Sequence, residues 1–249
     1  MKTLLKVDNL SKKYHTDNGE IEAIEDFSYD LEEGSFIAIV GPSGCGKSTI
    51  LSILCDIEKK SNGTLTFGKD DIKIGYMLQQ DTLFPWLNVL ENTLLGLRIN
   101  GSLNERTKNR TITLINTYGL GDFINHYPAS LSGGMRQRVA LIRTLAINPD
   151  ILLLDEAFSS LDYQTRLEVS NDVYKIIKKE NKTTIMVTHD ISEAISMASI
   201  VIVLSKRPCT IKNIYKIDLN EYSNPLDKRT DINFNTYYKA IWKDLDIHV

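Results

Sequence analysis

Few cysteines and no long apolar run characterise this sequence of 249 residues. Its cysteines, Cys45, Cys55 and Cys209, are odd in number and far apart. This predicts neither a disulfide framework nor a metal-binding cluster and suits a reducing cytosol. No apolar run approaches the roughly 20 residues that a membrane-spanning helix needs. The first ten residues, MKTLLKVDNL, lack the apolar core of a secretion signal, so none is predicted.

An excess of basic charge is also absent. The chain has 29 lysines and arginines against 32 aspartates and glutamates, which gives a net charge of −3. A general affinity for nucleic acid is therefore not expected, and only a local basic face could provide one. The 42% hydrophobic and 24% charged residues are ordinary for a globular protein. The length fits one large α/β domain with a subdomain, or two small domains.

A glycine-rich segment near the N-terminus predicts a phosphate-binding loop. Ser35–Val40 is a short apolar run typical of a buried parallel strand, Gly41–Ser48 has the spacing G-x-x-x-x-G-K-S, and an apolar-periodic helix follows from Thr49. Glycines let backbone N–H groups surround an anion, and the helix N-terminus adds its own. Lys47 would supply positive charge to the β- and γ-phosphates, and Ser48 a hydroxyl to Mg²⁺. The strand and the helix favour this interpretation over a chance glycine turn.

Strands and helices alternate after this loop, which predicts a largely parallel sheet with helices on both faces. Further strands are expected at 63–67, 73–78, 151–154, 183–188 and 200–204, and helices at 89–97, 105–118, 132–146, 163–179 and 191–197. Ligands bind at the carboxyl ends of parallel strands. The positions that directly follow a strand, and that should converge in space, are Gly41, Gln79, Asp155 and His189.

The two ends of the chain have other patterns. The beginning is expected to be antiparallel, with strands at 1–10, 21–24 and 27–31 and a polar loop at 11–20. Tyr14 in that loop is either a half-buried core residue or a face on which a purine stacks, and its spacing alone slightly favours the first. Beyond Ser205, one or two edge strands are expected at 209–219. The last helix has an apolar stripe that favours docking on its own domain over docking on a partner: Phe234, Tyr237, Tyr238, Ile241, Trp242 and Leu245.

Two helix starts carry signals of their own. Asn88, with Glu91 three residues later, resembles a capping pair. Ser132-Gly133-Gly134 opens a helix with a hydroxyl and exposed N–H groups, so it is a second candidate anion site.

The motif series GPSGCGKST, LSGGMRQRVAL, ILLLDE, SSLD and VTHD resembles that of the ABC-transporter ATPases, from about Leu4 to Leu204. The segments LFPWLNVLENTLLGL and LSKRP are similar to those of the subgroup that powers import of nitrate, sulfonates, taurine, bicarbonate or pyrimidine vitamin precursors. The resemblance implies an α/β fold: a P-loop NTPase core with a mostly parallel sheet, an N-terminal antiparallel β-subdomain and an α-helical subdomain. It implies an ATPase domain at 1–205, with the helical subdomain at about 85–147, and a short extension at 206–249 docked on it.

The resemblance also implies roles for single residues in hydrolysing ATP to ADP and phosphate. Glu156 would act as the catalytic base, with His189 and Gln79 orienting the water; Gln80 is the alternative if the register shifts by one. Mg²⁺ would be held by Ser48, Gln79 and, through water, Asp155. In the family the tyrosine position stacks on adenine, which reverses the preference stated for Tyr14. The loop residues that would bind ATP are Gly41, Pro42, Ser43, Gly44, Cys45, Gly46, Lys47, Ser48 and Thr49.

Partner chains are implied as well. Ser132, Gly133, Gly134 and Gln137 would reach the ATP held by a second copy of the chain, and Asp162 would cross that interface. Permease subunits would dock on Leu83, Phe84 and Trp86 at the cytoplasmic face of the membrane, and a solute-binding protein would act indirectly. No nucleic-acid partner is expected.

Some features depart from the family pattern. Ala157 stands where proline usually follows the catalytic glutamate, and the connection 68–74 is short. Oxidation of Cys45 could block binding, but a small residue that fits the loop is the favoured interpretation. An exporter subunit, a soluble ABC protein acting on ribosomes or DNA, and an inert nucleotide-binding scaffold remain alternatives. The single cassette and the absence of room for a long coiled coil argue against the ribosome and DNA types.

Overall fold

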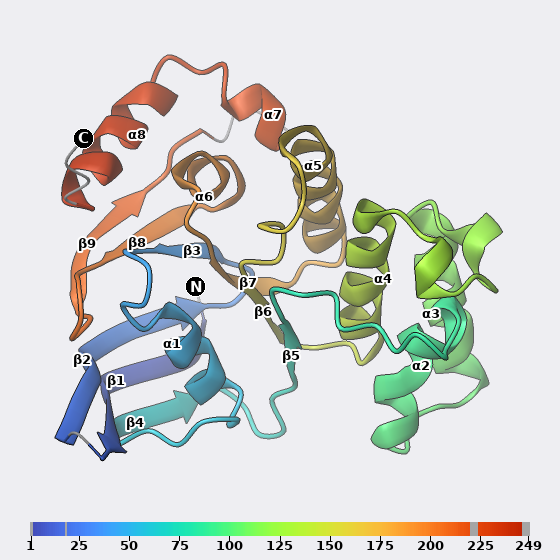
Figure 1. Ribbon diagram of the computed structural model, residues 1–249, viewed down its shortest axis with the longest axis horizontal. Coiled ribbons are helices and arrows are strands. Elements are labelled where there is room, and N and C mark those ends of the chain that lie inside the picture. Colours follow the sequence, from blue (N-terminus) through green and yellow to red (C-terminus); the bar gives the residue numbers. More distant parts are fainter. Residues whose placement is uncertain (1, 18, 220–223, 246–249) are drawn as a thin grey trace. The chain divides into compact units, whose positions relative to one another are not determined.

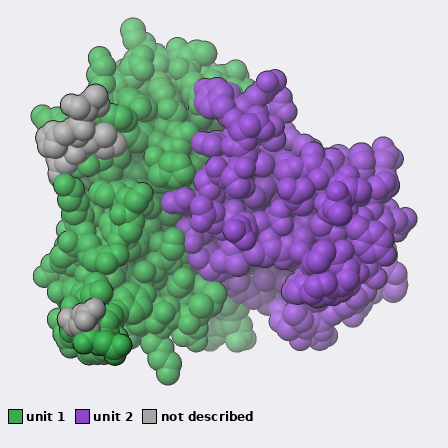
Figure 2. Space-filling view, in the orientation of Figure 1, with its two compact units in different colours: residues 1–72, 182–249 green, residues 73–181 purple. Residues whose placement is uncertain are grey.

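The structure, a computed structural model, describes residues 2–17, 19–219 and 224–245. The chain forms two compact units, shown in two colours in Figure 2. Unit 1 comprises Met1–Ile72 and Lys182–Val249, and unit 2 comprises Lys73–Asn181. Within these described residues, no helix combines the length and apolar character of a membrane span.

Unit 1 begins with an antiparallel sheet in the order β2-β1-β4 (Figure 1). β1 spans Thr3–Thr16, β2 Gly19–Glu32 and β4 Asn62–Phe67. The predicted polar loop at 11–20 is therefore wrong, because the hairpin ladder continues to the pair Thr16 and Gly19. The two strands expected at 21–24 and 27–31 are one strand, with Asp26 at a positive φ of 50°. Most polar side chains at 13–20 are exposed, while the backbone ladder satisfies the N–H and C=O groups.

The second sheet of unit 1 places β3 at its centre. β3 (Phe36–Val40) runs parallel to both β7 (Thr183–Val187) and β8 (Ile200–Leu204), and β9 (Ile211–Lys216) pairs antiparallel with β8. Every residue of β3 and of β7 is buried. This is the pattern of strands that are covered on both faces. Helices α1 (Lys47–Leu54) and α6 (Ile191–Met197) complete the α/β part of the unit.

The C-terminal helices pack within unit 1. α7 spans Pro225–Lys228 and contacts α6, while α8 spans Phe234–Asp244 and contacts both α6 and β9. Of the predicted apolar stripe, Phe234, Ile241 and Leu245 are buried. The Tyr238 and Trp242 rings stack with centroids 5.9 Å apart. The rest of that stripe is half-buried, so α8 covers β9 and α6 with one face.

Unit 2 combines two parallel strands with a helical part. β5 (Ile74–Met77) pairs with β6 (Ile151–Asp155). The helices are α2 (Val89–Ile99), α3 (Glu105–Thr117), α4 (Gly133–Ala146) and α5 (Tyr163–Lys179), and short 3-10 turns span Gly121–Phe123 and Pro128–Ser130. α4 contacts each of the other three helices and β5. The predicted Asn88–Glu91 capping pair is confirmed as a full capping box at the start of α2.

Candidate functional site

The glycine-rich loop of unit 1 connects β3 to the N-terminus of α1. Gly44 and Gly46 have φ values of 70° and 127°. A Cβ on Gly46 would lie 3.0 Å from the Ala23 carbonyl oxygen and 3.1 Å from Cys209 Sγ. Gly46 is also the N-cap of α1 and supplies no capping side chain. The first turn of α1 therefore relies on other acceptors for its N–H groups, as an anion-binding loop does.

Lys47 is folded over this loop. Its Nζ donates to the Gly41 oxygen at 2.8 Å and to the Pro42 oxygen at 3.0 Å. The residue is only 6% exposed, whereas Ser43 and Ser48 are exposed. The ammonium group thus stays at the loop, where it can exchange carbonyl partners for phosphate oxygens.

The segment between β8 and β9 holds the loop from the other side. Arg207 donates to the Gly44 oxygen from Nη2 at 2.6 Å and from Nε at 3.2 Å. Cys209 N donates to the Ala23 oxygen, and Glu25 N donates to the Cys209 oxygen, both at 3.0 Å. Sequence reasoning missed Arg207; the available signal was a basic pair directly after a strand that neighbours β3.

The two cysteines at this loop are buried thiols. Burial raises the pKa of Cys45, and burial with the neighbouring Cys45 raises the pKa of Cys209 to about 12. Both thiols are therefore protonated near neutral pH, which disfavours thiolate chemistry. This supports the view that Cys45 is a small residue that fits the loop.

His189 leaves the same sheet edge as the phosphate loop. β7 neighbours β3 in parallel, and Thr188 N donates to the Ile39 oxygen at 3.2 Å. His189 follows as an exposed residue, and Asp190 then caps α6 by accepting from Glu193 N. The predicted convergence of Gly41 and His189 thus occurs within unit 1.

Tyr14 is half-buried on β1, and one face of its ring is already covered. Lys12 Nζ lies 4.7 Å from the ring centroid. That ammonium is fixed by Glu58 Oε1 at 2.6 Å and by the Lys59 oxygen at 2.7 Å. A flat ligand can therefore stack only on the opposite face of Tyr14.

In unit 2, the end of β6 presents a pair of carboxylates. Asp155 is 7% exposed and accepts a hydrogen bond from Tyr76 Oη at 2.9 Å. Glu156 has a φ of 45°, which is strained for a residue other than glycine and is typical of functional sites. Gln79 Nε2 donates to Glu156 Oε2 at 3.4 Å and to Ser159 Oγ at 3.2 Å. The predicted group Gln79, Asp155 and Glu156 is thus assembled from the ends of β5 and β6.

The turn after Glu156 is maintained without proline. Ala157 is 2% exposed, and Ser159 N donates to the Glu156 oxygen at 3.0 Å. The turn is thus closed by a backbone hydrogen bond, with Ala157 packed inside.

The Ser132-Gly133-Gly134 turn caps α4. Ser132 Oγ accepts from Met135 N at 3.3 Å. A Cβ on Gly134 would lie 2.9 Å from Val169 Cγ2, so the glycine lets α4 approach α5 closely. Gln137, one turn further, is only 2% exposed. Among the described residues, its side-chain Oε1 is buried and has no hydrogen-bond partner.

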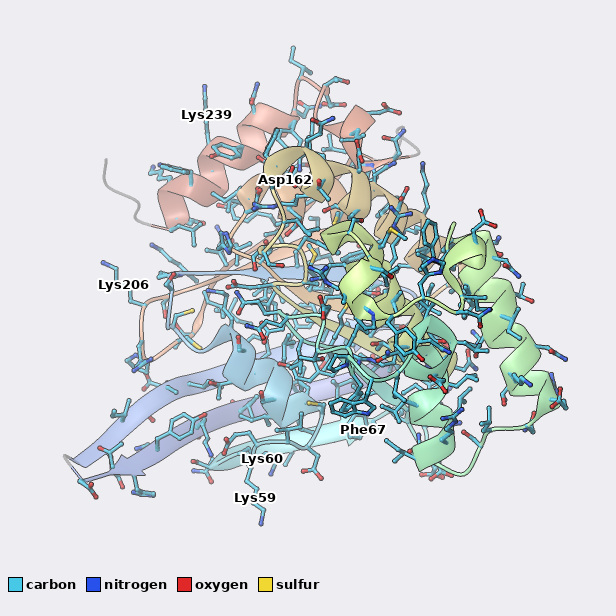
Figure 3. All side chains as sticks on the ribbon, turned by 45° about the vertical axis from the view of Figure 1, so that its right-hand side comes forward. Lys59, Lys60, Phe67, Asp162, Lys206 and Lys239 are labelled. Atoms are coloured by element: carbon cyan, nitrogen blue, oxygen red, sulfur yellow. The ribbon has the colours of Figure 1, made fainter. Side chains whose placement is uncertain are left out.

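Asp162 is the N-cap of α5 and is exposed (Figure 3). Its Oδ1 accepts from Thr165 N at 3.1 Å, and hydrogen bonds from the Thr165 side chain and backbone lower its pKa. The carboxylate is therefore charged near neutral pH at the positive end of α5.

The loop after β5 exposes two aromatic rings. Trp86 is 68% exposed and Phe84 37%, with ring centroids 5.2 Å apart, and Leu83 beside them is half-buried. Buried Asn92 fixes the loop by accepting from Phe84 N at 2.8 Å and donating to the Phe84 and Leu87 oxygens at 3.1 and 2.8 Å. Sequence reasoning missed Asn92 because an asparagine inside a helical pattern gives no such signal.

Two arginines of α4 bond to the start of this loop at Asp81. Arg136 Nε lies 2.9 Å from Asp81 Oδ2, and Arg143 Nη2 donates to the Asp81 oxygen at 2.8 Å. Burial lowers the pKa of Arg143, opposed by Asp81. The helix that begins at Ser132 is thus hydrogen-bonded to the segment between Gln79 and Phe84.

The family model described as "ABC transporter" matches residues 24–159, more than half of the chain. The chain belongs to the ABC transporter family. Its expected fold class and its expected activity as an ATPase are confirmed by this membership and by the solved cassettes it resembles.

Relatives of this ABC ATPase match along most of its length. The "Uncharacterized ABC transporter ATP-binding protein YtlC" of Bacillus subtilis (strain 168) is 44% identical and covers 98% of this chain and 96% of its own. The "Taurine import ATP-binding protein TauB" of Roseobacter denitrificans (strain ATCC 33942 / OCh 114) is 36% identical over 91% of this chain and 87% of its own. The chain is thus an ABC transporter ATP-binding subunit.

Solved structures of one ABC cassette, MJ0796, share the fold. The structure titled as dimeric has a TM-score of 0.73 at 32% identity and covers 86% of this chain and 99% of that one. A second, titled as a dimeric post-hydrolysis state bound to ADP and Pi, has a TM-score of 0.72 at 31% identity with the same coverage.

Asn92→Ala is expected to lower the free energy of unfolding of this ABC ATPase by about 3 kcal/mol, because it removes the partners of several buried backbone groups at once. Denaturant unfolding followed by circular dichroism measures the change. Asn100→Ala, at an exposed C-cap position of α2, is the matched control and should change stability by less than about 0.5 kcal/mol. Equal effects of the two variants would contradict the anchoring role of Asn92.

Proposed function

We propose that this chain is the ATP-hydrolysing subunit of an ABC importer for a small solute of the nitrate, sulfonate, taurine, bicarbonate or vitamin-precursor type. It would act on separate permease subunits at the cytoplasmic face of the membrane. The observation that carries this proposal is one loop of unit 2 with two features. The loop begins at Gln79, which is hydrogen-bonded to Glu156, and continues to the exposed Phe84–Trp86 pair. The printed import role of a 36%-identical relative supports the direction of transport.

ATP would be held by the loop Gly41–Thr49 and by Tyr14. Backbone N–H groups at the start of α1 and the Lys47 ammonium are the donors for phosphate oxygens. Arg207 keeps the loop curved through the Gly44 oxygen. The adenine ring would stack on the face of Tyr14 that Lys12 leaves open.

The residues proposed to hold Mg²⁺ have suitable chemistry. Ser48, Gln79 and Asp155 offer hydroxyl, amide and carboxylate oxygens, which are the hard ligands that Mg²⁺ prefers. The ion, when bound, would neutralise charge on the phosphates. Tyr76 donates a hydrogen bond to Asp155 Oδ2 and thereby restricts the rotation of that carboxylate.

Glu156 would accept the proton of the attacking water. The strained backbone of Glu156 fixes its carboxylate at the end of β6. Gln79 donates to one carboxylate oxygen, and the other oxygen would accept the proton. His189, which follows β7 in unit 1, would donate a hydrogen bond to the γ-phosphate and help to orient the water. Gln80 is exposed beside Gln79 and is not needed for this arrangement.

Two copies of the chain would complete each site. Ser132, Gly133 and Gly134 at the N-terminus of α4, together with Gln137, would contact the ATP held by the other copy. Asp162 would cross the interface. The solved relatives titled as dimeric cassettes support this pairing. We also propose residues 1–205 as the ATPase domain, with a helical subdomain at about 85–147, and 206–249 as an extension docked through α8.

Replacing both aromatic residues tests the permease contact. Phe84→Ala with Trp86→Ala should reduce solute uptake at least tenfold and leave ATP affinity within twofold, because the rings are exposed and lie outside the phosphate loop. Uptake by cells carrying the reconstituted system and ATP binding by the purified chain are the measurements. Phe67→Ala, at a residue 38% exposed in unit 1, is the control of similar exposure (Figure 3). Normal uptake by the double variant would contradict the proposed contact.

The solute is best identified through the membrane partner. The chain, co-purified with its permease and solute-binding protein, should hydrolyse ATP faster when the transported solute is present. Stimulation by an oxyanion or an amino sulfonate supports the proposed class. ATP turnover coupled to export of a compound from vesicles would contradict it.

A further inference from the structure

A pocket of about 290 Å³ lies within unit 2, lined by residues from the end of α3, from α4 and from α5. Its walls include Tyr118 after α3, Arg138 on α4 and Asp172, Lys175, Ile176 and Lys179 on α5. This volume is at the lower limit of known ligand sites. None of these residues belongs to the nucleotide-binding or catalytic set.

The charges that line the pocket are mostly positive. Arg138, Lys175 and Lys179 face one carboxylate, Asp172, whose Oδ2 lies 3.9 Å from Arg138 Nη1. Within the residues that the structure describes, neither Lys175 nor Lys179 forms an ion pair or a hydrogen bond through its side chain. In a chain of net charge −3, this local excess of two positive charges favours a doubly charged anion.

Arg138 also has an unused donor. Its Nε is buried and has no hydrogen-bond partner, although the side chain as a whole is 26% exposed. The guanidinium group therefore keeps donor capacity that the described residues do not use. A guanidinium group suits a carboxylate or phosphate because it can donate to two oxygens at once.

The remaining walls are apolar or neutral. Ile176, which is 1% exposed, and the half-buried Tyr118 both line the pocket. Burial and the neighbouring Glu180 raise the pKa of Tyr118 to about 12, so the phenol adds no negative charge. An aromatic or alicyclic body would fit against these two residues better than a fully hydrated inorganic ion.

We propose that this pocket binds a small organic dianion with a flat apolar body, such as an aromatic dicarboxylate. The carboxylates pair with Arg138, Lys175 and Lys179, and the ring packs against Ile176 and Tyr118. All residues of the site belong to unit 2, whereas the phosphate loop belongs to unit 1. Arg138 directly follows Gln137 on α4, so the bound dianion contacts the helix that begins at the Ser132 turn.

Isothermal titration with phthalate tests the site. The full chain is saturated with ADP, so that the phosphate loop does not compete for the anion. One phthalate per chain should bind, and benzoate, which has the same ring and one charge, should bind at least fivefold more weakly. Lys175→Met and Lys179→Met should each weaken phthalate binding by about fivefold, because each removes one cation from the pocket.

Lys178→Met is the matched control. Lys178 is exposed on the same helix but lies over the Tyr174 ring, 5.7 Å from its centroid, outside the pocket. Its replacement should change phthalate affinity by less than twofold. No saturable heat, equal binding of benzoate and phthalate, or an equal loss in Lys178→Met would each overturn the proposal.

Discussion

Glu156→Gln is expected to lower the rate of ATP hydrolysis by about 10²–10⁴-fold while ATP affinity changes by less than threefold. The amide keeps the size of the side chain and can still bond to Gln79, but it cannot accept a proton from water. Glu156 directly follows β6 and has a positive φ of 45°. We therefore expect that no neighbouring carboxylate takes its place as the base. Steady-state phosphate release and equilibrium binding of a fluorescent ATP analogue measure the two quantities.

Glu105→Gln is the control for this experiment. Glu105 begins α3, and its side chain is 84% exposed, so its loss of charge should leave phosphate release unchanged. Unchanged turnover in Glu156→Gln would show that another group is the base. A parallel loss of ATP affinity would show that Glu156 acts in binding instead.

Gly46→Ala is expected to lower ATP affinity at least 100-fold and the free energy of unfolding by about 3 kcal/mol. Two costs add at this position. The φ of 127° disfavours any side chain, and the new Cβ would lie 3.0 Å from the Ala23 oxygen. The loop would have to move away from β2, which displaces the N–H groups that face the phosphates.

Gly101→Ala separates these costs. Gly101 also has a positive φ, of 65°, but a Cβ there would meet nothing within 4 Å. It should lose about 1 kcal/mol of stability and no ATP affinity. Thermal unfolding and nucleotide titration distinguish the two variants. Wild-type affinity in Gly46→Ala would contradict the close packing of the loop against Ala23 and Cys209.

The parts of the site that lie in one continuous motif could be predicted from the sequence. The glycine spacing before Lys47, and the apolar run that ends at Asp155, each carry strand, turn and polar residues in one short segment. Parallel-sheet geometry then predicts that His189 follows a strand next to the one that precedes the phosphate loop. This prediction is confirmed, because β7 pairs in parallel with β3. The position of the loop relative to Asp155 stays a prediction.

Residues that act through tertiary contacts could not be predicted. Arg207 bonds to Gly44 across 163 residues of sequence, and Tyr76 bonds to Asp155 from the neighbouring strand. Lys12 covers Tyr14 from the same strand, but it is held there by Glu58 and Lys59, which lie far along the chain. Nothing in the local sequence distinguishes these side chains from ordinary surface residues.

The main error concerned the hairpin of β1 and β2. Charged and polar residues at 11–20 are typical of loops, but here β1 continues to Thr16 and pairs with β2, with Lys13, His15 and Thr16 exposed. Without an apolar alternation on either face, period-2 reasoning has no signal to detect. The predicted strand therefore ends at residue 10, whereas β1 continues through Tyr14 to Thr16.

We propose that ATP joins two copies of this chain, each contributing one part of every site. The most direct measurement is the mass of the Glu156→Gln chain by size-exclusion chromatography with light scattering, in ATP and in ADP. The account predicts twice the mass of one chain in ATP, one chain in ADP, and one chain in ATP when Ser132→Arg is added. A mass of one chain in ATP, with nucleotide bound to it, would contradict the account.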